Sequence, residues 1–445
     1  MQYMSNLSPL PYKGTRDYYP EDKRVQNYIF NTWRKVVESY GYQEYGTPLL
    51  EPLEVYMAKS GEELAGEQTY AFTDRGERTV AIRPEMTPSV SRLVAGRRQE
   101  LAYPARLFSI ANFMRYERPQ RGREREFWQL NADMFGAEGP AADAEIIILA
   151  HDIMEAFGAK DDMYVVRVND RNLINLMMSE YFGLDAVAGQ MMMKLLDRRA
   201  KISPEAFAEQ AVEIFGAENA EQGVAKLNTL LKAKTVLDLP AELHETEVGQ
   251  QLELLFARLE DAGVKNVRFD VSLMRGLDYY TGMVFEVFDL HPDNNRSMFG
   301  GGRYDGLVGL FGAEPIPTVG FAPGLTTTEL FLRTHNLLPE LKTRTEVGVV
   351  VVDDHLPEAL ALARQLRKED VRVELDLSGR KFDKQLKAVD KKGIPYVLFV
   401  GENEVREQIY TVKDLATGGE QKLSLERVVA LVKDGRRSAD DIFDL

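Results

Sequence analysis

The sequence predicts an α+β protein, in which a first region built on an antiparallel sheet with a helical insertion precedes a separate α/β domain. Three observations lead to this prediction. Residues 113–135 form two alternating stretches joined by a Pro/Gly loop, which is the pattern of a long antiparallel hairpin. Residues 173–262 are mostly helical in pattern. Strand and helix patterns alternate over 347–433, as in a mostly parallel sheet. We therefore expect a first domain at 1–335, a linker at 336–346 and a second domain at 347–445.

The composition is ordinary for a globular protein, and 445 residues are enough for two or three domains. No run of 18 apolar residues occurs, and the N-terminus lacks the pattern of a secretory signal, so we expect a cytoplasmic protein without a membrane span. The absence of cysteine excludes disulfides and zinc–thiolate sites, and the five histidines are too far apart in sequence to predict a metal cluster. The net charge of −15 argues against indiscriminate nucleic-acid binding but permits a local basic patch.

The first region begins with a loop, a helix and a broken strand. We expect the loop over 11–22 and the helix over 23–40, where apolar residues recur at helical spacing. The strand that follows is interrupted at Pro48, because proline has no backbone N–H to donate. This unit suits either ordinary packing or the seam of a dimer, and the pattern alone does not separate the two.

A hairpin at 72–83 leads into a helix that starts near Ser89. Glu85 and Thr87 lie at the junction between strand and helix, where side chains are exposed to a cleft. Thr87 is also a suitable helix cap, with Pro88 at the first helical position. The two interpretations are compatible.

The hairpin at 113–135 carries the clearest candidate site. Its second strand alternates, so Phe127, Gln129, Asn131 and Asp133 share one face while apolar side chains share the other. A guanidinium offers a planar pair of donors that matches phosphate oxygens. The hairpin therefore predicts a floor for a phosphate-bearing ligand, and the alternative is a solvated tip with matched charges. The arginines around its loop are Arg115, Arg118, Arg121, Arg123 and Arg125.

Strand patterns continue on both sides of the helical insertion. A helix at 140–157 and a strand at 164–170 precede it, and a strand at 267–272 follows it. The segment 274–286 opens with a turn and continues as an alternating strand. An arginine and two tyrosines at its start suit a polar pocket, or equally a capping cation and two core rings. These residues are Arg275, Tyr279 and Tyr280.

The densest glycine cluster, at 300–302, lets the backbone pass close to a ligand or to a neighbouring strand. It is not a P-loop, because the glycine–lysine pattern of such loops is absent. A strand from Thr318 then runs into a helix at 326–334, which closes the first region.

The second domain should have strands at 347–352, 371–375, 396–400 and 408–413, with helices between and after them. Six cations gather within thirteen residues against two aspartates, which suits a solvated helix face or a nucleic-acid contact equally well. These cations are Arg380, Lys381, Lys384, Lys387, Lys391 and Lys392.

In this order the segments resemble histidyl-tRNA synthetases, which are class II aminoacyl-tRNA synthetases, over about 12–432. Residues 40–48 are similar to the family's first motif, the dimer seam, and 115–129 to its second motif. Residues 275–281 and 300–306 are similar to the two segments characteristic of the histidine enzymes. The resemblance implies a class II catalytic core on an antiparallel sheet, with a helical insertion and a C-terminal anticodon-binding domain of α/β type.

The same resemblance implies a homodimeric histidine–tRNA ligase that activates L-histidine with ATP and Mg²⁺ and transfers it to tRNA(His). Arg115 and Arg275 would be catalytic, on opposite sides of the α-phosphate. The implied ATP-binding residues are Arg115, Glu117, Arg123 and Phe127. The implied histidine-binding residues are Glu85, Met86, Thr87, Arg115, Gln129, Asp133, Arg275, Tyr279, Tyr280 and Tyr304. The implied tRNA-binding residues are Gln120, Arg121, Lys381 and Lys384, and no protein-caged metal site is implied.

One departure concerns the family's third motif, which usually reads Gly-Leu-Glu-Arg and whose arginine holds the γ-phosphate. Here Gly324-Leu325 is followed by Thr326 and Thr327. We hypothesise that Arg121 or Arg123 compensates. The departure also raises an alternative, a catalytically silent paralogue that serves as a regulatory subunit of histidine biosynthesis or as a tRNA sensor.

Overall fold

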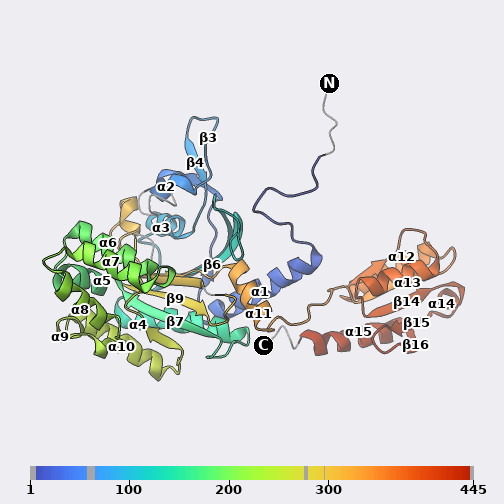
Figure 1. The fold of residues 1–445 in the computed structure, drawn as a ribbon. Coiled ribbons are helices and arrows are strands. Elements are labelled where there is room, and N and C mark those ends of the chain that lie inside the picture. The colour runs from blue at the N-terminus through green and yellow to red at the C-terminus, as the bar shows by residue number, and fades with distance from the viewer. Residues whose placement is uncertain (1–6, 58–65, 275–278, 295, 441–445) are drawn as a thin grey trace. The chain divides into compact units, whose positions relative to one another are not determined.

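The computed structural model describes residues 7–57, 66–274, 279–294 and 296–440 (Figure 1). The chain divides into two compact units, Met1–Leu338 and Pro339–Leu445, which we call unit 1 and unit 2. Within the described residues, no helix combines the length and the apolar character that crossing a membrane requires.

Unit 1 is built on an eight-stranded sheet with the strand order β1-β5-β6-β11-β10-β9-β7-β8. The pairs β1–β5 and β7–β8 are parallel, and the other five pairs are antiparallel. The predicted antiparallel core is therefore confirmed. The strands are β1 (Gln43–Glu44), β5 (Ala105–Met114), β6 (Glu126–Phe135), β7 (Tyr164–Asp170), β8 (Val267–Phe269), β9 (Met283–Asp289), β10 (Ser297–Arg303) and β11 (Thr318–Phe321).

The hairpin β5–β6 keeps one register over its whole length, from Ala105 opposite Phe135 to Met114 opposite Glu126. Side chains of a strand alternate between faces, so the register places Phe127 with Phe113 and Asp133 with Leu107 on the same face. The face predicted from alternation is confirmed. We call it the candidate face, and we call the other side of the sheet the helical face.

Three helices cover the helical face: α1 (Pro20–Ser39), α4 (Gly139–Ala156) and α11 (Leu325–Thr334). The ring of Phe30 on α1 lies 5.4 Å from that of Trp128 on β6. Asp143 of α4 accepts from Arg303 of β10 at 2.6 Å, and both side chains are about nine-tenths buried. Phe331 of α11 packs edge-on against Tyr164 of β7. The helical face is therefore closed by packing and by a buried ion pair.

Smaller elements precede and flank the candidate face. They are β2 (Leu50–Pro52), α2 (Glu54–Met57), β3 (Ala71–Thr73), β4 (Thr79–Ile82) and α3 (Thr87–Gly96). In Figure 1 they lie on the opposite side of the large sheet from α4. The stretch predicted as one strand broken at Pro48 is divided between two sheets, because β1 pairs with β5 while β2 pairs with β4.

The predicted helical stretch lies between β7 and β8. Its helices are α5 (Arg171–Leu176), the π-helical turn Met177–Tyr181, α6 (Ala186–Arg198), α7 (Pro204–Phe215), α8 (Ala220–Leu230), α9 (Ala241–His244) and α10 (Glu247–Asp261), with short 3₁₀ turns at Arg199–Lys201 and Val236–Asp238. A further 3₁₀ turn, Val308–Phe311, follows β10.

The glycines of β10 allow the neighbouring strands to approach this strand closely. A Cβ added at Gly301 would stand 2.2 Å from the carbonyl oxygen of Gly320 on β11. A Cβ at Gly302 would stand 2.9 Å from the ring of Tyr280. Gly302 therefore also makes room for a residue of the predicted pocket.

We expect Gly301→Ala to destabilise unit 1 by about 3 kcal/mol, because the added methyl overlaps main-chain atoms that cannot move independently. Gly306→Ala is the matched control, since nothing lies within 4 Å of its Cβ position and its φ is not positive. Thermal unfolding of both variants measures the difference. Equal melting temperatures for the two would contradict this explanation of the glycine run.

Unit 2 is an α/β domain with the strand order β13-β12-β14-β15-β16. The first three strands are parallel, as predicted, but β15 and β16 are antiparallel additions. Only residues 401–408 connect β14 to β15, which is shorter than the dozen or so residues that a parallel crossover needs. The elements are β12 (Val347–Val351), α12 (Leu356–Lys368), β13 (Val373–Leu375), α13 (Phe382–Lys391), β14 (Tyr396–Val400), α14 (Glu402–Glu407), β15 (Ile409–Asp414), β16 (Glu420–Ser424) and α15 (Leu425–Asp440).

Candidate functional site

Arg115 stands at the end of β5, where the hairpin opens into its loop. Its Nε donates to the carbonyl oxygen of Pro84 at 2.9 Å, and its guanidinium lies 5.1 Å from the ring centre of Phe127 on β6. Glu117 lies beside it, with 3.9 Å between the Arg115 Nη1 and the carboxylate. One anchored donor leaves the rest of the guanidinium fork for a ligand. The structure thus brings together three of the residues predicted to bind ATP.

The loop tip is held by several polar contacts. Arg123 donates to Glu117 at 3.2 Å, and the turn from Gln120 to Arg123 is closed by backbone hydrogen bonds. The side chain of Arg121 donates to Asn294 at 3.2 Å, and Arg296 donates to Gln120 at 3.2 Å. The tip is therefore not a freely solvated turn, because it docks on the loop between β9 and β10.

Arg125 has a structural task that the sequence did not reveal. The residue is 9% exposed, and its Nη1 donates to the Tyr12 hydroxyl at 3.0 Å. Its backbone N–H donates to the carbonyl of Gly14 at 2.6 Å, and its guanidinium stacks on Tyr116. Arg125 was one of the loop arginines considered as a phosphate ligand, but in the structure it ties the N-terminal segment to the hairpin.

Glu85 and Thr87 meet a tyrosine from a distant part of the sequence. The hydroxyl of Tyr279 lies 3.1 Å from the Glu85 carboxylate and 3.3 Å from the Thr87 hydroxyl. All three side chains are buried. The ring of Tyr279 packs on Tyr280 and Tyr304, with ring centres 5.0 and 5.6 Å apart. The prediction of Thr87 as the helix cap is wrong, because α3 already begins at Thr87, Met86 is in the N-cap position, and no side chain makes a capping hydrogen bond.

Asp133 lies under the tyrosines and is 2% exposed. Its Oδ1 accepts from the Tyr304 hydroxyl. Gly320, opposite on β11, makes room for the carboxylate, because a Cβ there would stand 2.1 Å from Oδ1. Burial raises the pKa of Asp133 to about 7, although the Tyr304 hydrogen bond acts in the other direction. The carboxylate is therefore poised to become an anion near neutral pH.

The remaining predicted histidine ligands differ in their surroundings. Gln129 is half-buried on the candidate face, where β6 forms an isolated bridge with Gly324. The side chain of Met86 is buried, accepts from the Thr47 hydroxyl and packs with Ala111 and Phe113. Met86 thus shapes the apolar support of the candidate face.

The predicted residue Arg275 and its neighbours through Asp278 lie outside the described residues. The strand predicted to continue through Tyr280 begins later, at Met283. Tyr280 therefore belongs to the connection before β9, which allows its ring to turn over Gly302.

Thr327 occupies the place of the third-motif arginine. Its hydroxyl lies 2.9 Å from the carbonyl oxygen of Met298 and 3.1 Å from that of Gly324 and can donate to either, so it ties the start of α11 to β10. Met298 follows Arg296 by two residues, and Arg296 holds the loop tip through Gln120. The start of α11 thus contacts β10, the strand that follows the loop contacted by Arg121.

The structure adds two residues on the candidate face that sequence reasoning missed. Tyr45 extends β1 beside β5, because its N–H donates to Phe108 at 2.9 Å. Ser109 on β5 stands directly opposite Asn131 on β6. The alternation already placed Asn131 on this face, but nothing in the local pattern marks Tyr45 or Ser109.

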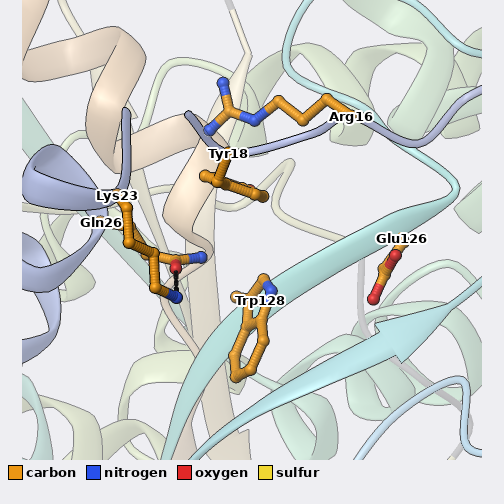
Figure 2. Close-up of a pocket in the computed structure, with 6 residues that line it drawn as sticks. All are labelled: Arg16, Tyr18, Lys23, Gln26, Glu126 and Trp128. Carbon is orange, nitrogen blue, oxygen red and sulfur yellow. Dashed lines mark hydrogen bonds between the residues drawn. The ribbon is translucent and has the colours of Figure 1, made fainter. Parts of the chain in front are cut away.

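A small pocket of about 170 Å³ lies on the helical face, separate from these residues (Figure 2). Figure 2 shows the amide nitrogen of Gln26 turned toward the space between the rings of Tyr18 and Trp128, and Lys23 hydrogen-bonded to Gln26. Arg16 borders the pocket and pairs with Glu329 of α11 at 2.7 Å. Trp128 alternates with Phe127, so this pocket is not part of the candidate site.

One group in the described part of the chain has the composition of a cation site: His151, Asp152 and Glu155 of α4. The His151 Nδ1 is 2.6 Å from the Tyr164 hydroxyl, and Asp152 accepts from Tyr40. These contacts and their location on the helical face separate the group from the candidate site.

In unit 2 the predicted basic cluster follows the exposed side of α13. Gln385 and Val389 form its buried side, and Gln385 bonds the backbone of Val351 in both directions at 3.0 Å. Lys381 and Lys384 are exposed. Arg380 pairs with Asp376, and Lys392 pairs with Glu374. The cluster is thus an exposed basic helix face whose two ends are partly neutralised.

Comparison with known proteins agrees with this arrangement. Residues 14–328 match the family model of histidyl-tRNA synthetase, and residues 346–435 match that of the anticodon binding domain. The chain is 41% identical to a histidine–tRNA ligase of Leptospira biflexa over 427 residues, which are 95% of this chain and 97% of that protein.

Solved structures show the same fold. A histidyl-tRNA synthetase from Nostoc sp. PCC 7120 has a TM-score of 0.79 at 25% identity, covering 96% of this chain and 99% of that one. A protein of Bacillus halodurans C, described as an ATP phosphoribosyltransferase regulatory subunit/histidyl-tRNA synthetase, has a TM-score of 0.73 at 24% identity and shares the fold, covering 90% of this chain and 100% of that one. The family match and the curated relative together establish that this chain belongs to the histidyl-tRNA synthetase family of aminoacyl-tRNA ligases.

Proposed function

We propose that this chain activates L-histidine with ATP and transfers it to the 3′ end of tRNA(His). The observation that carries the proposal is the grouping of two kinds of side chain on one face of the sheet. Arg115, Glu117 and Phe127 suit a nucleotide. Buried Glu85 and Asp133, bridged by tyrosines, suit an amino acid with polar ring nitrogens. The named activity of the Leptospira relative supports the same function.

In the activation step, the histidine carboxylate attacks the α-phosphate of ATP, a new P–O bond forms and pyrophosphate leaves. The nucleophile is already an anion at neutral pH, so positioning and charge neutralisation supply the catalysis. Arg115 would hold the α-phosphate, with Arg275 on its opposite side. Phe127 would stack under the adenine, and Glu117 would accept from its amino group. In the second step a terminal ribose hydroxyl of the tRNA attacks the acyl group, and AMP leaves.

The amino-acid side of the site would use the remaining residues. Glu85, Thr87, Gln129 and Asp133 would surround the amine and carboxylate, while Tyr280 and Tyr304 would bond the imidazole. A site that satisfies both ring nitrogens rejects analogues that lack them by about 10⁴–10⁵.

The other substrates fit the charges of the described residues. Glu117 pairs with Arg115 and Arg123 and so offsets part of the positive charge of these two arginines. Mg²⁺ would therefore accompany ATP and neutralise part of the charge of its phosphates. Gln120 and Arg121 at the loop tip would contact the acceptor end of the tRNA, and Lys381 and Lys384 its anticodon part. Exposed apolar residues beside the first motif, including Leu49 and Leu50, support a homodimer. A cytoplasmic location completes the proposal.

Histidine-dependent exchange between ATP and labelled pyrophosphate tests the function. Exchange followed by transfer to tRNA(His) is the expected result. Binding of tRNA without exchange would instead indicate a sensor, and loss of both would indicate a regulatory subunit. That alternative is motivated by Thr327, which replaces the third-motif arginine.

We expect Arg121→Ala and Arg123→Ala together to raise the KM for ATP by about tenfold to a hundredfold, because a cation near the outer phosphates is needed in place of the missing arginine. Arg121 is the first candidate, since it contacts Asn294 in the loop that leads to Met298, and the carbonyl of Met298 accepts from Thr327. Arg118→Ala, an exposed arginine of the same loop, is the control. The hypothesis fails if neither single variant nor the double variant changes the KM for ATP in pyrophosphate exchange.

A further inference from the structure

Four buried oxygens gather on the candidate face beside Asp133, and none makes a hydrogen bond of complete geometry within the described part of the chain. Unpartnered buried polar atoms are costly and need an explanation. The atoms are the Tyr45 hydroxyl, the Ser109 hydroxyl, the Asn131 Oδ1 and the Asp133 Oδ2.

Strand pairing brings these four residues together from three adjacent strands. β1 runs parallel to β5 with Glu44 beside Phe108, so Tyr45 comes next to Ser109. Ser109 is directly opposite Asn131, and Asp133 is the next residue of β6 on the same face. Ser109, Asn131 and Asp133 are each at most 3% exposed. The four polar groups thus form one buried layer.

Tyr45 is held in place and remains a hydrogen-bond donor. Its ring packs beside Met86, Ala111 and Phe113. Burial raises the pKa of Tyr45 well above its usual range, and the negative charge of Asp133 adds to this effect, while the Ser109 hydroxyl, which is close enough to hydrogen-bond with Tyr45, acts in the other direction. The hydroxyl therefore keeps its proton near neutral pH, and Asp133, whose charge contributes to this shift, already accepts from Tyr304 through its other oxygen.

The donors and acceptors of this layer match one water molecule. Tyr45 and Ser109 each have a hydroxyl proton to donate, while Asn131 Oδ1 and Asp133 Oδ2 only accept. A water that accepts twice and donates twice satisfies all four atoms, and buried waters commonly make two to four hydrogen bonds.

We propose that Tyr45 and Ser109 are positioning residues for amino-acid recognition: with Asn131 they hold an ordered water against Asp133 Oδ2 and so stabilise the ionised, correctly oriented carboxylate. This inference rests on the proposed role of Asp133 in binding the histidine ammonium. Tyr45 itself does not touch the substrate; it acts through Asp133.

The test is calorimetric binding of L-histidine to the full-length protein between pH 5.5 and 8.5. The affinity of the wild type should rise with pH as Asp133 ionises. In Tyr45→Phe the affinity should fall about tenfold near neutral pH, and the rising limb should move to higher pH, because the carboxylate has lost a hydrogen bond that favours its charged form. Ser109→Ala should act in the same direction. Titration of the free histidine imidazole is common to all variants and cancels in the comparison.

Tyr164→Phe is the matched control, since Tyr164 is also buried but bonds His151 on the helical face. The proposal would be overturned if the histidine affinity of Tyr45→Phe rises over the same pH range as the affinities of the wild type and Tyr164→Phe. The melting temperature of each variant tests for misfolding. We expect little change for Tyr45→Phe, because this substitution removes only a hydroxyl group.

A double-mutant cycle separates action through Asp133 from direct contact with the ligand. The effect of Tyr45→Phe should vanish in an Asp133→Asn background. An undiminished effect there would contradict the positioning role. Pyrophosphate exchange tests the ligase function independently. If histidine binds without exchange, the ligase activity is refuted, and the pH dependence of binding still tests the positioning role of Tyr45. A protein that binds no histidine would refute both proposals.

Discussion

Replacing Arg115 by alanine is expected to lower histidine-dependent pyrophosphate exchange by a factor of about 10²–10³. Arg115 is anchored by its Nε on Pro84 and directed by its position above Phe127, so its remaining donors are preorganised for phosphate oxygens. Removing a preorganised donor costs more in a transition state than in the ground state, because charge develops there. The loss should therefore fall mainly on kcat.

Arg115→Lys should recover only part of this loss, since an ammonium keeps the charge but not the planar fork of donors. Arg106→Ala is the control, because Arg106 lies on the same strand but pairs with Glu145 of α4 on the helical face. Exchange assays with melting temperatures measure all three variants. An Arg115→Ala protein within threefold of the wild type would remove Arg115 from the catalytic site.

Asp133→Asn should lower kcat/KM for histidine by a similar factor while leaving the KM for ATP nearly unchanged. The amide keeps the shape and the hydrogen bond from Tyr304 but cannot neutralise an ammonium group. The profile of kcat/KM against pH reports groups of the free enzyme. The wild type should therefore show a limb that rises through about pH 7, where Asp133 ionises, and the variant should lack it.

The same substitution has a predictable effect on stability. The pKa of Asp133 is about 7 in the folded protein and about 3.9 in an unfolded chain, so the folded state holds the proton more tightly. The resulting stabilisation is fully present below pH 4 and is lost as the pH rises through 7. Between pH 5 and pH 8 the wild type should lose up to about 3 kcal/mol relative to Asp133→Asn. Thermal unfolding at the two pH values measures this difference, and parallel melting temperatures would contradict the raised pKa.

Local patterns were sufficient for much of the fold. Alternation from Phe127 to Asp133 assigned one face of β6, and pairing with β5 confirmed it. The same reasoning located β15 but missed β16. The expected parallel pairing also does not extend to these two strands, because the short connection after β14 permits only an antiparallel partner. The same reasoning also extended a strand through Tyr280, because alternation of residue types does not reveal where a backbone leaves the sheet.

Local sequence accounts for one part of the candidate site, and the tertiary structure accounts for the other. Motif residues such as Arg115, Glu117 and Phe127 are close in sequence, and the hairpin alone brings them together. The pairing of Tyr279 with Glu85 spans 194 residues and depends on where α3 lies over the sheet. No periodicity of either segment contains that information.

The sequence by itself determined which residue types face which side of each strand, since this follows from the two-residue repeat of a β-strand. Only the tertiary structure decided which strands are neighbours. The strand order placed Tyr45 beside Ser109, Ser109 opposite Asn131, and Gly320 opposite Asp133. The physical reason is that strand pairing is set by non-local packing, so a buried polar layer built from three strands arises only when the sheet has formed.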